Sequence, residues 1–260
     1  MFKQAALAAT AALAALSFNA QAALQAGDLA FTAFNADEDG FALVALADIA
    51  ANTTVFFSDN EWTGSAFNTG ESYSQWVSGG AVIQAGTVIR FSAVDSATNL
   101  AASVGNFSRL SVSGNSNWGL SNSNETLYAY LGSSATAPTT FLAAVTNGSF
   151  EVDGPLTGTG LAQGVNAIRL NANATSATPD YAEYTGVRSG QGSFASYLPA
   201  LVNPSNWVVD TTNGNYAGTV PNTAAFSIKQ TPAVPEPESM ALVGAGLAVM
   251  GSLARRRRLV

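Results

Sequence analysis

The residues best suited to acid–base chemistry are carboxylates in two short stretches, SDNEW and NTGES. Asp59, Glu61 and Glu71 fall in predicted loops that could converge at one end of a sheet. Two carboxylates at a suitable separation can hydrolyse a glycosidic bond, one as acid and the other as nucleophile or base. Loops of acidic proteins contain carboxylates by default, however. We therefore favour a ligand-binding, metal-binding or structural role for Asp59, Glu61, Trp62 and Glu71 over a catalytic one.

The stretch FNADEDGF resembles the start of a calcium-binding loop, because Asn35, Asp37 and Asp39 precede Gly40 at the spacing of an EF-hand. An EF-hand also needs a bidentate Glu at loop position twelve, where this chain has Leu46, and it needs flanking helices. The alternative is an acidic hairpin turn whose side chains bond nearby backbone amides. Calcium is the one cofactor that these residues suggest, and nothing in the sequence requires it.

Aromatic side chains in Gly/Ser/Asn-rich surroundings give a third candidate site. Trp62, Trp76, Trp118 and Tyr73 all have such neighbours. Exposed rings can stack on the apolar faces of sugars while amides bond the hydroxyls. Packing in the core is the commoner fate of such residues, and both alternatives stay open at this point.

The composition excludes several kinds of chemistry. The chain contains neither cysteine nor histidine, which excludes disulfides, Cys/His zinc sites and nucleophiles activated by histidine. Residues 23–234 carry 15 acidic and 5 basic side chains, a net charge of −10. Nucleic acid is therefore not an expected partner, because binding it needs clustered positive charge. Neutral glycans or divalent cations fit this charge better.

These candidate residues must be positioned by short strands, because apolar runs alternate with turn residues along the chain. We predict an all-β sandwich with one short helical segment at residues 193–202, ended by Asn203-Pro204. Both phases of several strands are apolar, which indicates burial on both faces or small residues on the outer one. The predicted strands are residues 28–34, 41–47, 53–58, 87–93, 126–131, 141–145, 167–170 and 207–209.

The N-terminus has the pattern of a secretory signal. Lys3 precedes an apolar run of residues 5–16, which is too short for a stable membrane span. Ala20-Gln21-Ala22 supplies the small-x-small pattern of a cleavage site. We expect signal peptidase to cleave after Ala22.

The C-terminus combines three features in a fixed order. Pro235, Glu236 and Pro237 come first, then an apolar segment of residues 240–254, then Arg255, Arg256, Arg257 and Arg258. The prolines keep the first part extended, because they fix φ and remove amide donors. As a helix the apolar segment would be roughly 22 Å long, shorter than the bilayer core of ~30 Å. The arginines would hold its end on the cytoplasmic side.

This order of features resembles the PEP-CTERM sorting signal of Gram-negative bacteria. The resemblance implies that an exosortase-type transpeptidase removes the tail after transient anchoring in the inner membrane. The protein would then pass to the cell surface or extracellular matrix, with exopolysaccharide as a further partner. The layout expected from these features is a signal peptide at 1–22, a β-sandwich domain at 23–229, a Pro-rich linker at 230–238 and a hydrophobic sorting helix at 239–260.

A weaker resemblance concerns the folded domain. The segments FALVALADIAANTTVFFSDNEW, AVIQAGTVIRFSAVD and GLSNSNETLYAYLG are similar to lamin-tail-type modules of secreted bacterial proteins, although Ala42 and Leu43 replace a usual acidic residue. This resemblance implies an immunoglobulin-like sandwich and no particular activity. We expect a non-enzymatic structural or adhesive protein associated with exopolysaccharide. The alternatives are a carbohydrate-binding module, calcium-dependent or not, and a carboxylate-based hydrolase.

Overall fold

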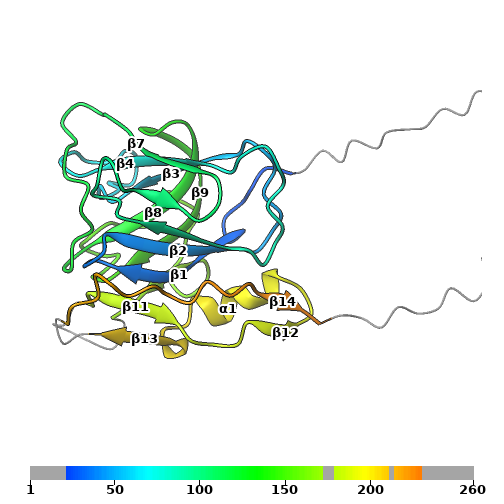
Figure 1. The fold of residues 1–260 in the computed structure, drawn as a ribbon. Coiled ribbons are helices and arrows are strands. Elements are labelled where there is room, and N and C mark those ends of the chain that lie inside the picture. The colour runs from blue at the N-terminus through cyan, green and yellow to red at the C-terminus, as the bar shows by residue number, and fades with distance from the viewer. Residues whose placement is uncertain (1–21, 172–178, 211–213, 230–260) are drawn as a thin grey trace, which may run out of the picture. The chain divides into compact units, whose positions relative to one another are not determined.

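The computed structural model describes residues 22–171, 179–210 and 214–229, and these residues form two stacked β-sheets with little helix (Figure 1). The first sheet has the strand order β13-β11-β1-β2-β5-β6, and the second has the order β10-β9-β8-β3-β4-β7. This arrangement confirms the predicted all-β class with sandwich-like sheets. The immunoglobulin-like identity stays a prediction. The expected signal helix and sorting helix lie outside the described residues.

The strands of the first sheet are β1 (Leu29–Asn35), β2 (Gly40–Ala45), β5 (Val88–Ser92), β6 (Ala101–Ala102), β11 (Tyr181–Tyr184) and β13 (Trp207–Asp210). Those of the second sheet are β3 (Thr54–Ser58), β4 (Tyr73–Val77), β7 (Asn106–Arg109), β8 (Thr126–Ser134), β9 (Ala137–Thr146) and β10 (Ala167–Arg169). A separate parallel pair consists of β12 (Ser189–Gln191) and β14 (Ser227–Ile228).

Aromatic rings from both sheets meet in the core. Phe41 on β2 and Phe91 on β5 lie 5.0 and 5.1 Å, centroid to centroid, from Phe57 on β3. Phe107 on β7 lies 4.9 Å from Phe91. The Phe57–Phe91 and Phe91–Phe107 pairs are edge-to-face, and such pairs add to the stability gained by burial alone. The cluster joins the two sheets at the strands that lead into the candidate site.

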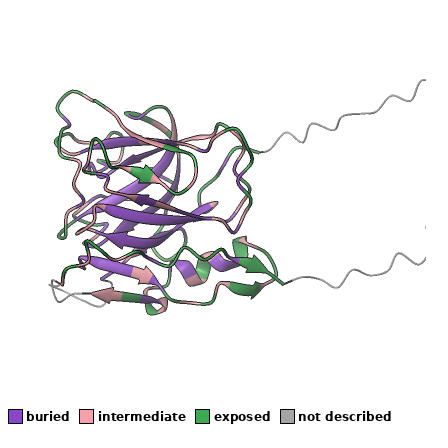
Figure 2. Cartoon of the chain, viewed as in Figure 1, coloured by how far each residue is buried: buried purple, intermediate pink, exposed green. Residues whose placement is uncertain are grey.

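The second sheet is buried on its other face too. A second apolar cluster contains Phe56, Tyr128 and Phe141, which alternate with residues of the main core along β3, β8 and β9. Loop residues such as Trp62 and Phe150 complete this cluster. Figure 2 shows long buried stretches along the strands of both sheets, and the ends of β8 and β9 at their connecting turn are more exposed. Burial on both faces therefore explains why both phases of these strands are apolar in the sequence.

The predicted helical segment is present as two short elements. A 3₁₀ turn, Ala195–Tyr197, leads into α1 (Leu198–Leu201), and a second 3₁₀ turn, Pro204–Asn206, follows. Pro199 lies in the first turn of α1, where its missing amide is not needed. Tyr197 and Leu201 are fully buried in the main core. The segment therefore packs against the domain and does not project from it.

The turns before β2 and β5 contain residues that tolerate a positive φ. Asp39 has a φ of +53° before Gly40, where the β1–β2 hairpin closes. Gly86 has a φ of +91°, and a Cβ there would lie 2.4 Å from the carbonyl oxygen of Phe226. A side chain at residue 86 would therefore clash with the last described segment of the domain.

Candidate functional site

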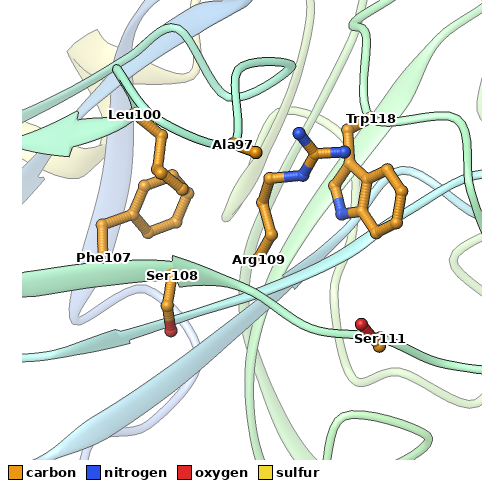
Figure 3. Close-up of a pocket in the computed structure, with 7 residues that line it drawn as sticks. All are labelled: Ala97, Leu100, Phe107, Ser108, Arg109, Ser111 and Trp118. Atoms are coloured by element: carbon orange, nitrogen blue, oxygen red, sulfur yellow. The ribbon is translucent and has the colours of Figure 1, made fainter.

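A surface pocket of about 400 Å³ lies beside β7 (Figure 3). In Figure 3, Leu100 faces Phe107 on one side, and Arg109 lies against Trp118 on the other. The pocket is large enough for a small ligand. Its lining residues are Ala97, Leu100, Phe107, Ser108, Arg109, Ser111 and Trp118.

Arg109 and Trp118 hold each other in place at this pocket. The guanidinium carbon of Arg109 is 3.8 Å from the centroid of the Trp118 ring, a cation–π contact. Arg109 Nη1 donates to the carbonyl of Asp95 at 2.6 Å, and Trp118 Nε1 donates to the carbonyl of Tyr73 at 3.4 Å. The pocket therefore presents an ordered cation beside an aromatic ring, together with two serine hydroxyls.

Trp118 is the half-buried member of the four aromatics singled out in the sequence. Trp62, Trp76 and Tyr73 are exposed by only 6, 1 and 2%. Trp76 Nε1 donates to the carbonyl of Val104 at 2.7 Å, as a buried indole requires. Of the four, Trp118 is therefore the residue placed to meet a ligand.

Asp59 lies at the end of β3 and is 1% exposed. Its Oδ1 accepts hydrogen bonds from the backbone N–H and the hydroxyl of Ser72, at 2.7 and 2.8 Å. Its Oδ2 is buried and accepts no hydrogen bond from a described residue. Burial raises the pKa of Asp59 to about 7, against the effect of the Ser72 hydrogen bonds.

Glu71 and Glu125 join Asp59 in one group of carboxyls. Burial, followed by the charges of Asp59 and Glu61, raises the pKa of Glu71 to about 8. Burial, followed by the charges of Asp59 and Glu71, raises the pKa of Glu125 well above its ordinary value. Asp59, Glu61 and Glu71 all lie in the β3–β4 loop, and their charges affect one another, whereas their use as a binding site stays a prediction. The structure adds Glu125, which directly precedes β8.

Glu61 and Trp62 belong to a small hairpin within the β3–β4 loop. Asn68 donates its backbone N–H to the Glu61 carbonyl, and its side-chain amide to the Glu61 carboxylate. Trp62 bridges to Phe67, and its Nε1 donates to the Thr157 carbonyl at 2.9 Å. Trp62 therefore anchors the loop on the outer face of the second sheet.

The acidic turn at the β1–β2 hairpin uses its side chains as hydrogen-bond acceptors. Asn35 Oδ1 accepts from the amides of residues 37 and 38, both at 3.2 Å. Asp37 Oδ2 accepts from the amide of Tyr216 at 2.6 Å, and Asp39 Oδ1 from that of Leu120 at 2.5 Å. Asn35, Asp37 and Asp39 therefore bond three different segments, which accounts for their residue types without calcium. Burial raises the pKa of Asp39 to about 6.

The described residues form neither an acidic metal-binding group nor a membrane-spanning helix. Within residues 22–171, 179–210 and 214–229, no group of three or more Asp or Glu side chains is arranged to hold a metal ion. In the same ranges no helix combines the length and the apolar character needed to cross a membrane.

Fold and site together define an acidic β-sandwich domain with an aromatic pocket on its surface and buried carboxyls in and beside the β3–β4 loop. Comparison with known protein families adds information on how this domain is exported. Residues 233–258 match the model of the PEP-CTERM protein-sorting motif. The chain is thus a secreted protein that is anchored transiently in a membrane, processed by an exosortase-type enzyme and sorted to the cell surface. No curated protein and no solved structure matches the chain significantly.

The match confirms the prediction made from Pro235, Glu236, Pro237 and the arginines at 255–258, all of which lie within it. The resemblance to lamin-tail modules gains no support from these comparisons. Sequence reasoning missed two site residues, Arg109 and Glu125. Neither has a local signal, because each acquires its role from segments distant in the chain.

Proposed function

We propose that this exported domain is a non-enzymatic surface or matrix protein with a structural and adhesive role in an exopolysaccharide layer. The observation that carries the proposal is the sorting motif at residues 233–258, which delivers the domain to the cell surface. The fold suits such a role, because two sheets joined by an aromatic core resist local opening. The net negative charge of the domain disfavours non-specific binding to anionic polymers.

The placement of the carboxyls supports a non-enzymatic role. A glycosidase needs two carboxyls that reach the same bond in an open cleft. Asp59 and Glu125 are 1 and 3% exposed, and neither they nor Glu71 line the pocket beside β7. Purified full-length chain should therefore release no reducing sugar from the host's exopolysaccharide. Release that disappears in Glu71→Gln would make the protein a hydrolase and overturn the proposal.

The structural role is tested in the host. Deleting the gene is expected to loosen the matrix, so that more polysaccharide is released by mild shear. Restoring the gene should reverse this effect. Restoring a version without residues 233–258 should not, because that protein would lack the sorting motif. A deletion strain whose matrix retains polysaccharide as well as the parent strain would contradict the proposal.

Carbohydrate binding is the second candidate, and the pocket beside β7 is the observation that favours it. The guanidinium of Arg109 and the hydroxyls of Ser108 and Ser111 can bond sugar hydroxyls, while Leu100 supplies an apolar wall. In a sedimentation assay with exopolysaccharide, Arg109→Ala should reduce the bound fraction. Val208→Ala, at a 57% exposed position on β13, is the matched control and should bind as the wild type does. Equal sedimentation of all three proteins would count against this site.

A further inference from the structure

The β3–β4 loop contains three buried oxygen atoms that accept no hydrogen bond from a described residue. They are Asp59 Oδ2, Asn68 Oδ1 and Glu71 Oε2. As oxygens of ionised carboxylates or of an amide they can only accept, and all come from one segment of 14 residues, 59–72. A buried acceptor without a donor costs about 1–3 kcal/mol, and more when it is charged. Three such atoms in one loop therefore call for a common explanation.

Hydrogen bonds place these side chains in one neighbourhood. The amide of Asn68 donates to the carboxylate of Glu61, which leaves Asn68 Oδ1 free to accept. The backbone N–H of Glu71 donates to Asn60 Oδ1, next to Asp59, and the backbone N–H of Ser72, next to Glu71, donates to Asp59 Oδ1. Among the described residues, no Lys or Arg forms an ion pair with Asp59, Glu71 or Glu125. The protein thus gathers carboxyls here without a cationic partner among those residues.

The chemistry of these atoms points to a particular kind of ligand. All are oxygens, two from carboxylates and one from an amide carbonyl, which is the donor set that Ca²⁺ prefers. Transition metals prefer nitrogen or sulfur ligands, and this chain has no His or Cys to supply them. Mg²⁺ retains most of its water and is rarely held by a protein cage alone.

We propose that the β3–β4 loop binds Ca²⁺ through Asp59 Oδ2, Asn68 Oδ1 and Glu71 Oε2, with water completing the coordination. Glu125, directly before β8, belongs to the same group of carboxyls without being a required ligand. The proposed set has two carboxylates and one amide, so it differs from a group of three acidic side chains, which the described residues do not form around one ion. Extracellular calcium modules bind with dissociation constants on the order of 10⁻⁴–10⁻³ M, and we expect a value in that range. The site does not depend on the proposed structural role.

The test is calorimetric titration of full-length chain with CaCl₂ after treatment with EDTA. We expect saturable binding of one ion and a rise in melting temperature that EDTA reverses. Glu71→Gln should weaken binding at least tenfold, and Asp59→Asn should do the same. Glu71 is half-buried, so its variant remains informative if Asp59→Asn does not fold. Glu151→Gln, at an exposed position, is the control and should bind as the wild type does.

Two results would overturn the proposed site, and a third would overturn the choice of ion. One is the absence of calcium binding at millimolar concentration, with no effect of EDTA on melting. The carboxyls would then be neutral acids held apart from any cation. The other is undiminished binding by both Asp59→Asn and Glu71→Gln, which would place the ion on surface carboxylates elsewhere. A larger rise in melting temperature with Mg²⁺ than with Ca²⁺ would contradict the choice of ion.

Discussion

Replacing Asp59 by Asn should make the metal-free protein more stable at alkaline pH. Asp59 is 1% exposed, and burial raises its pKa from 3.8 to about 7. The native protein therefore keeps a proton that the unfolded chain releases near pH 4. Stability that is fully present below pH 4 is lost as the pH rises through 7, because unfolding frees the carboxyl to ionise in water. Asn is neutral at every pH, so the variant does not lose this part of its stability as the pH rises.

The size of the effect follows from the pKa. Each unit of difference between the native and unfolded pKa corresponds to about 1.4 kcal/mol. The rise from 3.8 to about 7 therefore corresponds to roughly 4 kcal/mol at pH 8.5. Glu71 and Glu125, whose pKa values are also raised, make the wild type lose further stability over the same range. The amide can still accept the Ser72 hydrogen bonds through its oxygen.

The assay is urea unfolding followed by tryptophan fluorescence, in EDTA, at pH 4.5, 6.5 and 8.5. The wild type should lose stability steadily across this series, and Asp59→Asn should lose less. The variant should be close to the wild type at pH 4.5 and more stable at pH 8.5. Glu151→Gln, which alters an exposed carboxylate, should follow the wild type. Equal pH slopes for wild type and Asp59→Asn would refute the reasoning, because Asp59 would then be ionised in the native state at all three pH values.

Three other changes test the fold and the sorting tail. Phe91→Ala should cost about 3–5 kcal/mol in urea unfolding, because the ring contacts Phe57 across the sandwich and is fully buried; a cost below about 1 kcal/mol would contradict this. Gly86→Ala should lower the melting temperature, since its Cβ would meet the Phe226 carbonyl at 2.4 Å, and an unchanged melting curve would contradict that clash. Changing all of Arg255–Arg258 to Gln should slow removal of the tail, because the apolar segment would lose the charges that hold its end in the cytoplasm. Immunoblotting of membrane and surface fractions would measure how much protein keeps its tail. An unchanged fraction of processed protein would contradict this role of the arginines.

Much of the strand pattern could be predicted because turn residues separate the apolar runs. The predicted strand at 53–58 corresponds to β3, and the one at 87–93 to β5, each to within one residue at either end. The observed strands are shorter than the predicted ones by one residue at one end or both, because strand ends are defined by hydrogen bonding and not by residue type. The helix at 193–202 was predicted from apolar spacing, and Pro199 correctly indicated that it would be short.

Several strands could not be predicted because their polar residues hide the pattern. YSQWV forms β4 and NFSR forms β7, although both contain serine and an amide side chain. These strands pair with each other, and β7 is the edge strand of the second sheet, where its residues are exposed or only half-buried. β11 and β12 were not predicted either, and β12 (SGQ) contains no large apolar residue. Tertiary pairing, and not local propensity, determines such strands.

Some residues of the candidate site could also be predicted from the local sequence, and others depend on strand pairing between distant segments. Asp59, Glu61 and Glu71 lie within 13 residues, so their convergence could be predicted from one loop. Glu125 reaches them only because β8 pairs with β3 in the register that sets Ser58 opposite Tyr128. Arg109 meets Trp118 because β7 pairs with β4, whose Tyr73 carbonyl also accepts from Trp118. Both additions thus arise from the pairing order of the second sheet. A change in the register of β8 against β3 would separate Glu125 from the loop and relieve the repulsion that a cation would otherwise balance.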